Sequence, residues 1–279
     1  MTPLNADLHC HSTVSDGLLP PTEVVRRAVN NGVELLALTD HDELGGLAAA
    51  RAEADAQDLR FLDGVEISVS WGDQTIHIVG LDVDPADATL SAGLASVRSG
   101  RDARAQRIGE ELERIGIHGA LEGAQAYAGN PALVSRAHFA RFMVATGVAR
   151  DTASVFEHYL TPGKPGYVEH VWATLDEAVG WIHAAGGVAV IAHPGRYRLP
   201  EAEMTRFYDR FRDLGGEGIE VVSGAHSPSQ VRDYARIARR YGFAASRASD
   251  FHGVGESPVD LGRAAALPPD LEPIWLRFL

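Results

Sequence analysis

Residues 6–11 and 39–42 decide the predicted fold, and they read Ala6-Asp7-Leu8-His9-Cys10-His11 and Thr39-Asp40-His41-Asp42. In both cases an apolar run that suits a buried strand ends in polar side chains that can bind a metal. Between the two stretches, residues 21–30 place apolar side chains on one helical face, and Gly32 follows. A strand, a helix and a second strand in this order predict a parallel unit.

The alternation of strand and helix patterns continues over most of the chain. Strands are predicted at residues 6–9, 35–39, 65–69, 76–81, 188–192, 218–222 and 243–248. Helices are predicted at residues 21–30, 44–56, 175–185 and 228–241. Strands in one layer with helices outside predict an α/β protein, an irregular parallel barrel near the size of the common (β/α)8 barrel.

Residues 97–165 depart from this alternation, because helical patterns follow one another there without a strand signal. An apolar stripe at helical spacing runs through residues 108–115, and the stretch ends in a turn-forming segment rich in proline and glycine. We therefore predict a barrel domain made of residues 1–96 and 166–279. Residues 97–165 are predicted to be an inserted helical subdomain that binds the substrate.

The composition describes a globular, acidic chain with 25 basic and 38 acidic residues and a net charge of −13. A field of this sign disfavours a protein that coats nucleic acid or an anionic membrane, although a local basic site is compatible with it. The single cysteine, Cys10, excludes an internal disulfide and fits a reducing cytoplasm. Without a secretory signal or an apolar run of about 20 residues, we expect a soluble cytoplasmic protein with no membrane and no obligate protein partner.

Histidines and carboxylates recur near the ends of the predicted strands. His9 and His11 stand two apart in extended backbone, so that both imidazoles face the same way. Further candidates in or after later strands are His41, Glu66, His77, His193, Asp250 and His252. His77 taken alone would be interpreted as a packed core residue, but the whole set is costly to bury without cations. The pattern predicts a metal centre at the carboxyl edge, where parallel barrels build active sites.

In order along the chain, these motifs resemble those of the PHP (polymerase and histidinol phosphatase) family of phosphoesterases. The resemblance rests on His9-Cys10-His11, Ser15-Asp16-Gly17, Thr39-Asp40-His41-Asp42, Gly64-Val65-Glu66, Ala192-His193-Pro194 and Ser249-Asp250-Phe251-His252. It implies a distorted (β/α)7 barrel of PHP type with two or three divalent ions. By this resemblance one ion would be held by His9, His11, Glu66 and Asp250, a second by Glu66, His77 and His193, and a third by Asp16, His41 and His252. Such a mixed set suits manganese, zinc or iron, and its carboxylates favour Mn²⁺.

The resemblance also implies a reaction. Two neighbouring ions would hold a bridging hydroxide for in-line attack on a phosphomonoester, with Glu66 and Asp250 as catalytic carboxylates. Serine or cysteine catalysis is disfavoured, because no Gly-x-Ser-x-Gly elbow occurs and Cys10 should point away from the ligands. We expect a phosphoric monoester hydrolase that removes the 3′-phosphate of a nucleoside 3′,5′-bisphosphate (pAp), leaving AMP and phosphate.

Cationic residues in and after the insertion are candidates for binding this substrate. A helix start is predicted at residues 130–132, and guanidinium groups near a helix N-terminus can grip a phosphate. His138 would bind the substrate or donate a proton to the leaving oxygen. The other candidates are Ser135, Arg136, Lys164 and Arg196.

Other functions remain open at this stage. Family members linked to the trimming of short RNA suggest a 5′-end exonuclease, and a histidinol-phosphate-type phosphatase is a further alternative. The arginines at positions 98, 101, 104 and 107 could serve an RNA strand, although a solvated helix face is the preferred interpretation of that row. A non-enzymatic metal-binding module is disfavoured because every expected ligand position is filled.

Overall fold

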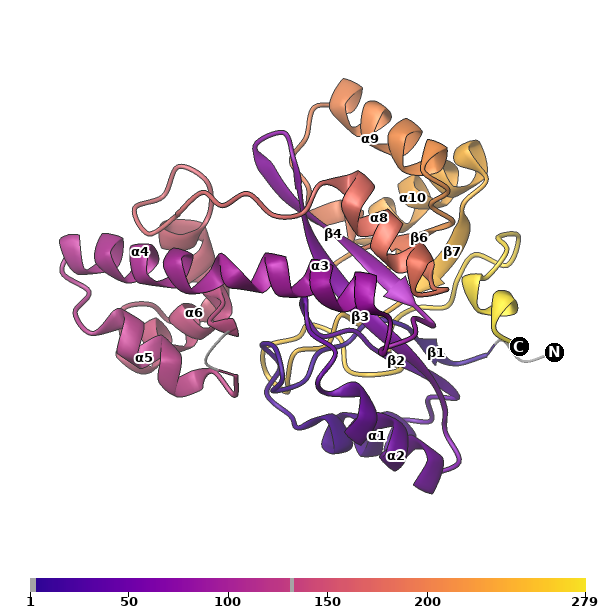
Figure 1. Ribbon diagram of the computed structural model, residues 1–279, viewed down its shortest axis with the longest axis horizontal. Coiled ribbons are helices and arrows are strands. Elements are labelled where there is room, and N and C mark those ends of the chain that lie inside the picture. Colours follow the sequence, from indigo (N-terminus) through magenta and orange to yellow (C-terminus); the bar gives the residue numbers. More distant parts are fainter. Residues whose placement is uncertain (1–3, 131–132) are drawn as a thin grey trace.

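The computed structural model describes residues 4–130 and 133–279 and consists of a barrel and a projecting group of helices (Figure 1). Seven strands form one sheet in chain order. They are β1 (Ala6–Asp7), β2 (Leu35–Leu38), β3 (Arg60–Trp71), β4 (Gln74–Leu81), β5 (Val188–Ile191), β6 (Gly218–Val222) and β7 (Ala244–Arg247). Each strand overlaps one that the apolar runs predict.

The first and last strands meet, which turns the sheet into a nearly closed barrel. The Leu8 N–H donates to the Arg247 carbonyl, and Cys10 forms a parallel bridge with Phe251. Side chains from β1 to β5 and from β7 share one buried apolar cluster, which fills the inside of the barrel. The C-terminus lies on the side of the barrel away from the projecting helices (Figure 1).

Helices cover the outside of the barrel and build the projection. They are α1 (Pro21–Asn30), α2 (Leu47–Ala56), α3 (Ala88–Ser99), α4 (Arg101–Arg114), α5 (Ala120–Tyr127), α6 (Arg136–Ala145), α7 (Thr152–Val155), α8 (Leu175–Ala184), α9 (Glu201–Asp213) and α10 (Pro228–Tyr241), with a π-helical turn at Phe156–Leu160. In Figure 1, α1 and α2 lie below the sheet and α8 to α10 above it. None of the helices in the described ranges has the length and apolar character that crossing a membrane requires.

The prediction of a parallel barrel is wrong at β4. This strand pairs antiparallel with both β3 and β5. Only Gly72 and Asp73 separate β3 from β4, and Gly72 has a φ of 58°. A connection this short can only form a hairpin, since parallel strands need a long crossover. The amino-terminal part of β4 therefore lies at the edge where the neighbouring strands have their carboxyl ends.

Helix α9 is absent from the predicted elements, although its sequence is amphipathic. Phe207, Tyr208 and Phe211 are buried in the cluster that packs on the outside of the sheet. Charged residues interrupt this narrow apolar stripe, so that the segment lacks the longer apolar run by which the other helices are predicted.

Helices α4 to α7, here called the helical lobe (residues 101–160), project to the left in Figure 1. Their apolar side chains form a cluster of their own, with Ile108, Leu112 and Phe139 at its centre. Helix α3 instead packs Leu90 and Leu94 into the cluster on the outside of the barrel. The helix thus connects barrel and lobe, and the domain boundary at residues 96 and 97 stays a prediction.

Arg247 should be critical for stability, because its buried guanidinium closes the seam between β1 and β7. It donates to Asn5 Oδ1 and to the carbonyl oxygens of Ala6, Gly262, Ala264 and Ala265. Arg247→Met leaves these acceptors without a charged donor and should lower the free energy of unfolding by about 3 kcal/mol in urea titrations. The exposed Arg239, paired with Asp270, is the control, and Arg239→Met should cost at most about 0.5 kcal/mol. Equal losses would contradict this role.

Candidate metal centre

Glu66 of β3 lies at the centre of the barrel mouth and is completely buried. Nitrogen atoms of five histidine rings lie within 3.3 Å of its carboxylate oxygens: His9, His11 and His41 near Oε2, and His77 and His193 near Oε1. Burial alone would raise the pKa of this carboxyl, but the surrounding histidines hold it well below its usual range. The mouth therefore contains a buried negative charge surrounded by imidazoles.

His9 and His11 follow β1 and face the same side. Their Nε2 atoms are 3.1 Å apart, and both lie near Asp250 Oδ1, at 3.6 and 3.4 Å. Five residues are here called the inner cluster: His9, Glu66, His77, His193 and Asp250. His77 reaches this cluster from the amino-terminal half of β4, since that strand runs in the opposite direction.

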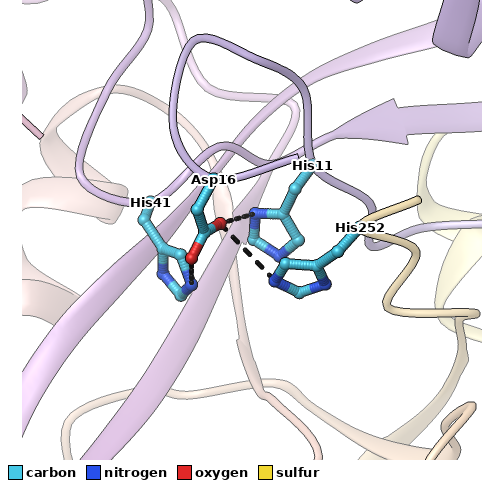
Figure 2. A group of neighbouring side chains, drawn as sticks. All are labelled: His11, Asp16, His41 and His252. Carbon is cyan, nitrogen blue, oxygen red and sulfur yellow. Dashed lines mark ion pairs between the residues drawn. The ribbon is translucent and has the colours of Figure 1, made fainter. Parts of the chain in front are cut away.

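A second group lies nearer the surface and consists of His11, Asp16, His41 and His252, here called the outer cluster. Figure 2 shows the Asp16 carboxylate between the ring of His41 and the rings of His11 and His252. The oxygens of Asp16 lie 3.9 Å from nitrogens of His11 and His41 and 3.5 Å from His252 Nε2. His11 thus stands between the two clusters.

The loop that carries Asp16 is held by buried polar contacts. Asp40 accepts hydrogen bonds from the Ser12 N–H and from the hydroxyls of Ser12 and Ser15. A Cβ at Gly17 would lie 2.4 Å from the His11 carbonyl oxygen, so only glycine allows this close approach. The Ser-Asp-Gly sequence is therefore required by the shape of the loop as well as by its carboxylate.

Glu220 of β6 is not among the residues that the sequence predicts for the site. Its carboxylate accepts from His9 Nδ1 at 2.6 Å and from the His193 N–H at 2.7 Å. A carboxylate in this position fixes the ring of His9 and leaves its Nε2 free to face the clusters. A lone acidic residue inside the apolar strand Gly218–Val222 was the available signal.

The residues present fit divalent cations. Several buried carboxylate oxygens accept no hydrogen bond from the described residues, namely Glu66 Oε2, Asp16 Oδ1 and Asp250 Oδ1. Each of these residues belongs to a group whose nitrogen and oxygen ligand atoms all lie within 4.8 Å of one another. Bound cations would remove the cost of burying these unpaired oxygens, and mixed imidazole and carboxylate ligands suit first-row divalent metals.

A cavity of about 260 Å³ adjoins the clusters, and Asp16, His77 and Asp250 are among its lining residues. Arginines line it as well: Arg101 and Arg104 from α4, Arg136 from α6, and Arg196. The preference for a solvated helix face is wrong for Arg101 and Arg104, which are each only 6% exposed. The first turns of α4 carry both side chains to this cavity, which the arginine spacing alone does not reveal.

The arginines from the lobe make part of the cavity strongly cationic. Arg101 pairs with Asp42, yet its buried Nε has no hydrogen-bond partner among the described residues. Burial, together with the charges of Arg136 and Arg101, lowers the pKa of Arg104 to about 9. The guanidinium groups of Arg101 and Arg104 stack near the ring of Trp172. An anion would relieve this crowding of positive charge.

The remaining substrate-binding candidates are placed differently. Arg196 pairs with Asp250, and Ser135 donates to Asp16 Oδ2 at 3.2 Å, so both lie at the clusters. Arg136 lines the cavity and donates to the Leu160 carbonyl. Lys164 is exposed and is not among the lining residues.

His138 has a structural task in the fold. Its Nδ1 accepts from the Ser135 N–H at 3.0 Å and completes a capping box at the start of α6. It is 1% exposed, does not line the cavity, and burial lowers its pKa to about 4. The geometry therefore does not favour proton donation by His138. Of the helix start predicted at residues 130–132, positions 131 and 132 lie outside the described residues, and α6 begins at Arg136.

Comparison with known proteins gives consistent matches over the whole chain. The PHP domain family matches residues 7–217. A 3′,5′-nucleoside bisphosphate phosphatase of Chromobacterium violaceum is 53% identical over 97% of this chain and 95% of its own length, and a 5′-3′ exoribonuclease of Escherichia coli is 44% identical over 96% and 92%.

Solved structures agree with these matches. A C. violaceum protein described as an amidohydrolase, with bound sulfate and no metal, has a TM-score of 0.95 at 53% identity and covers 98% of this chain and 95% of its own. A Bifidobacterium adolescentis protein assigned as a metal-dependent phosphoesterase has a TM-score of 0.80 at 27% identity, covering 96% and 92%. The fold of this chain is thus shared with a protein assigned as a metal-dependent phosphoesterase.

The capping role of His138 can be separated from a catalytic one. Glutamine at this position keeps a side chain that can accept from the Ser135 N–H, so His138→Gln should remain folded and keep kcat within about threefold of the wild type. Loss of a general acid would instead lower kcat by about 100-fold or more on a poor leaving group. Steady-state kinetics on an alkyl phosphate distinguish the two results.

Metal binding should release protons and strengthen as the pH rises. Burial opposes a charge on the rings of His9 and His11, but Glu66, Glu220 and Asp250 raise the pKa of His9 well above its usual value. Asp250 and Glu66 raise the pKa of His11 to about 10. These raised pKa values favour an extra proton on the pair before an ion binds, and a ring must lose that proton to act as a ligand. Titration of Mn²⁺ into chelator-treated protein, in buffers of different ionisation enthalpy, should show at least about one proton released per ion. Heats independent of the buffer would contradict this.

Proposed function

The chain belongs to the PHP domain family, and on this premise we infer that it removes the 3′-phosphate from nucleoside 3′,5′-bisphosphates. Such a reaction converts pAp to AMP and phosphate and makes the protein a metal-dependent phosphoric monoester hydrolase. The observation that carries this inference is a single cavity that contains both metal-ligand residues and buried arginines. The 53% identity to a bisphosphate phosphatase supports it.

Two or three divalent ions would be held by the two clusters. Candidate ligands are His9, His11, Glu66, His77, His193 and Asp250 in and beside the inner cluster, and Asp16, His41 and His252 in the outer one. The mixture of imidazole and carboxylate donors supports Mn²⁺, with Zn²⁺ or Fe²⁺ as alternatives. When bound, the ions would lower the pKa of a water molecule and neutralise charge on the phosphoryl oxygens.

The protein's own groups orient the reacting phosphate. Burial favours the neutral acid, but Arg196 and His9 hold the pKa of Asp250 well below its usual range, so this carboxylate stays charged. Arg196 contacts Asp250 and lines the cavity. It would donate a hydrogen bond to a phosphoryl oxygen while the negative charge on that oxygen increases. Glu66 would stay charged among its histidines and hold the metal ligands in place.

The cavity arginines of the helical lobe would bind the phosphate that does not react. Arg101, Arg104 and Arg136 supply positive charge in the same cavity as the metal ligands, and Trp172 packs against two of the guanidiniums. A bisphosphate places one phosphate at the metal ligands and the other at the arginines, whereas a monophosphate can occupy only one of these two places. The cationic amine of histidinol phosphate would be repelled here, which disfavours that alternative.

A 5′-3′ exoribonuclease activity on short RNA remains the second candidate. Exoribonucleases of E. coli and Haemophilus influenzae are 44% and 40% identical to this chain. The same arginines would attract a nucleic-acid phosphate despite the net charge of −13. Comparative kinetics must therefore include an oligonucleotide.

Steady-state rates on pAp, AMP, histidinol phosphate and a 5′-phosphorylated oligoribonucleotide test the proposed function. With Mn²⁺ present, kcat/KM for pAp should exceed that for AMP by about 100-fold, the value of two charge-assisted hydrogen bonds to the second phosphate. If pAp is not clearly preferred over simple monophosphates, the substrate is wrong. If the oligonucleotide is preferred, the second candidate replaces the first.

Arg104→Met should separate binding of the second phosphate from chemistry. It removes one buried cation from the cavity and should raise KM for pAp by about 10-fold or more, with p-nitrophenyl phosphate hydrolysis changed less than about threefold. Arg107 lies on the same helix but is exposed, and Arg107→Met should leave both substrates unaffected. Parallel losses with the two substrates would contradict the assignment.

A further inference from the structure

The outer cluster contains no ligand from within a strand, whereas the inner cluster contains two, Glu66 and His77. Glu66 and His77 lie within β3 and β4, whose backbones are fixed by the sheet. Asp16, His41 and His252 lie outside the named strands, in the segments that follow β1, β2 and β7. Their positions must be set by contacts other than a continuous strand ladder.

Helix α6 of the helical lobe holds the Asp16 loop at two points. The Ser135 hydroxyl, at the helix start, donates to Asp16 Oδ2 at 3.2 Å. One helical turn and a half further on, Arg141 Nη2 donates to the Asp16 backbone carbonyl at 2.6 Å. Both the side chain and the backbone of this ligand are therefore in contact with the lobe.

Arg141 also holds the loop that carries His252. Its Nε and Nη2 donate to the two carboxylate oxygens of Glu256 at 2.8 and 2.7 Å. In the same loop, the Ser257 hydroxyl accepts from the His252 N–H at 2.7 Å. A single guanidinium thus connects the loops of two outer-cluster ligands.

The lobe also contacts the segment beside His41. Arg101 pairs with the Asp42 carboxylate, and Arg98 of α3 donates to the Asp42 carbonyl at 2.6 Å. The apolar clusters of lobe and barrel are separate, so charged contacts make up much of the attachment at the mouth. Arg141 is 6% exposed and Glu256 is half-buried, and removal of either side chain would destabilise the attachment because it leaves the other charge without its partner.

We propose that Arg141 and Glu256 are a positioning pair through which the helical lobe sets the affinity of the outer cluster for a divalent ion. The pair touches no ion itself. It holds Asp16 and His252 at the spacing that an ion requires, as partners outside the coordination sphere do in other metal sites. By linkage, an ion in the outer cluster stabilises the attachment of α6 to the barrel. The proposal rests on the metal dependence of the proposed function but not on its substrate.

The test counts ions and does not use activity. Chelator-treated wild type, Arg141→Met and Glu256→Gln are titrated with Mn²⁺, and the bound ions are counted by calorimetry and by elemental analysis after desalting. Arg141→Met should weaken the weakest-bound ion by about 10- to 100-fold and leave the others unchanged. Glu256→Gln keeps the shape of the pair and should weaken the same ion less, and it provides the measurement if Arg141→Met does not fold.

Arg27 and Asp260 provide a matched control. They form another bidentate pair, with both bonds at 2.7 Å, between α1 and the C-terminal segment. Arg27→Met should retain all ions at wild-type affinity. Hydrogen exchange should show α6 amides slowed by Mn²⁺ in the wild type and in Arg27→Met, but much less in Arg141→Met.

Three results would overturn the proposal. Arg141→Met and Glu256→Gln could bind every ion as tightly as the wild type, or they could weaken all ions equally, which indicates general loosening. The wild type could also bind too few ions to fill the outer cluster. A wild type that binds no divalent ion would remove the proposed function as well, whereas unchanged variants of an ion-binding wild type remove only the positioning role.

Discussion

The structure depends on the burial of one carboxylate, that of Glu66, among five imidazoles. An ionised group without water is expensive unless opposite charge compensates it. The nitrogens around Glu66 come from segments far apart in the chain, with His9 after β1 and His193 after β5. A barrel is a fold that can bring these segments to one point, because the ends of neighbouring strands meet at its mouth. The fold and the metal-ligand residues therefore depend on each other, because the barrel mouth is what gathers these side chains around Glu66.

Barrel and lobe make different contributions to the mouth. In the inner cluster, β3 and β4 carry Glu66 and His77, and the Glu220 carboxylate holds His9 and the backbone of His193. The helical lobe adds cations, since Arg101 and Arg104 are buried against Trp172 at the same cavity. A phosphate ester with a second phosphate matches this arrangement of metal-ligand side chains and guanidiniums. A site with the barrel alone would lack the means to recognise the rest of the substrate.

Local patterns in the sequence predict the parts of the site that strands deliver. The spacing of His9 and His11 and the polar residues at the ends of apolar runs are enough to predict that the ligands meet at one edge of the sheet. The end of a strand can be recognised from the neighbouring residues alone. The direction of β4 was also predictable, since Gly72 and Asp73 leave room only for a hairpin. The capping box at Ser135 was harder to recognise, as histidine replaces the usual glutamate. The burial of Arg104 depends on how the start of α4 packs beside Trp172, and no local pattern contains that information.

The most direct measurement of the central claim is anomalous diffraction from crystals grown with Mn²⁺, recorded on both sides of the manganese absorption edge. The account predicts anomalous peaks at coordination distance, about 2.2 Å, from Glu66 and from the nitrogens of His9 and His193. A Glu66 carboxylate that only receives hydrogen bonds from protonated histidines, with no peak beside it in Mn²⁺-saturated crystals, would contradict it.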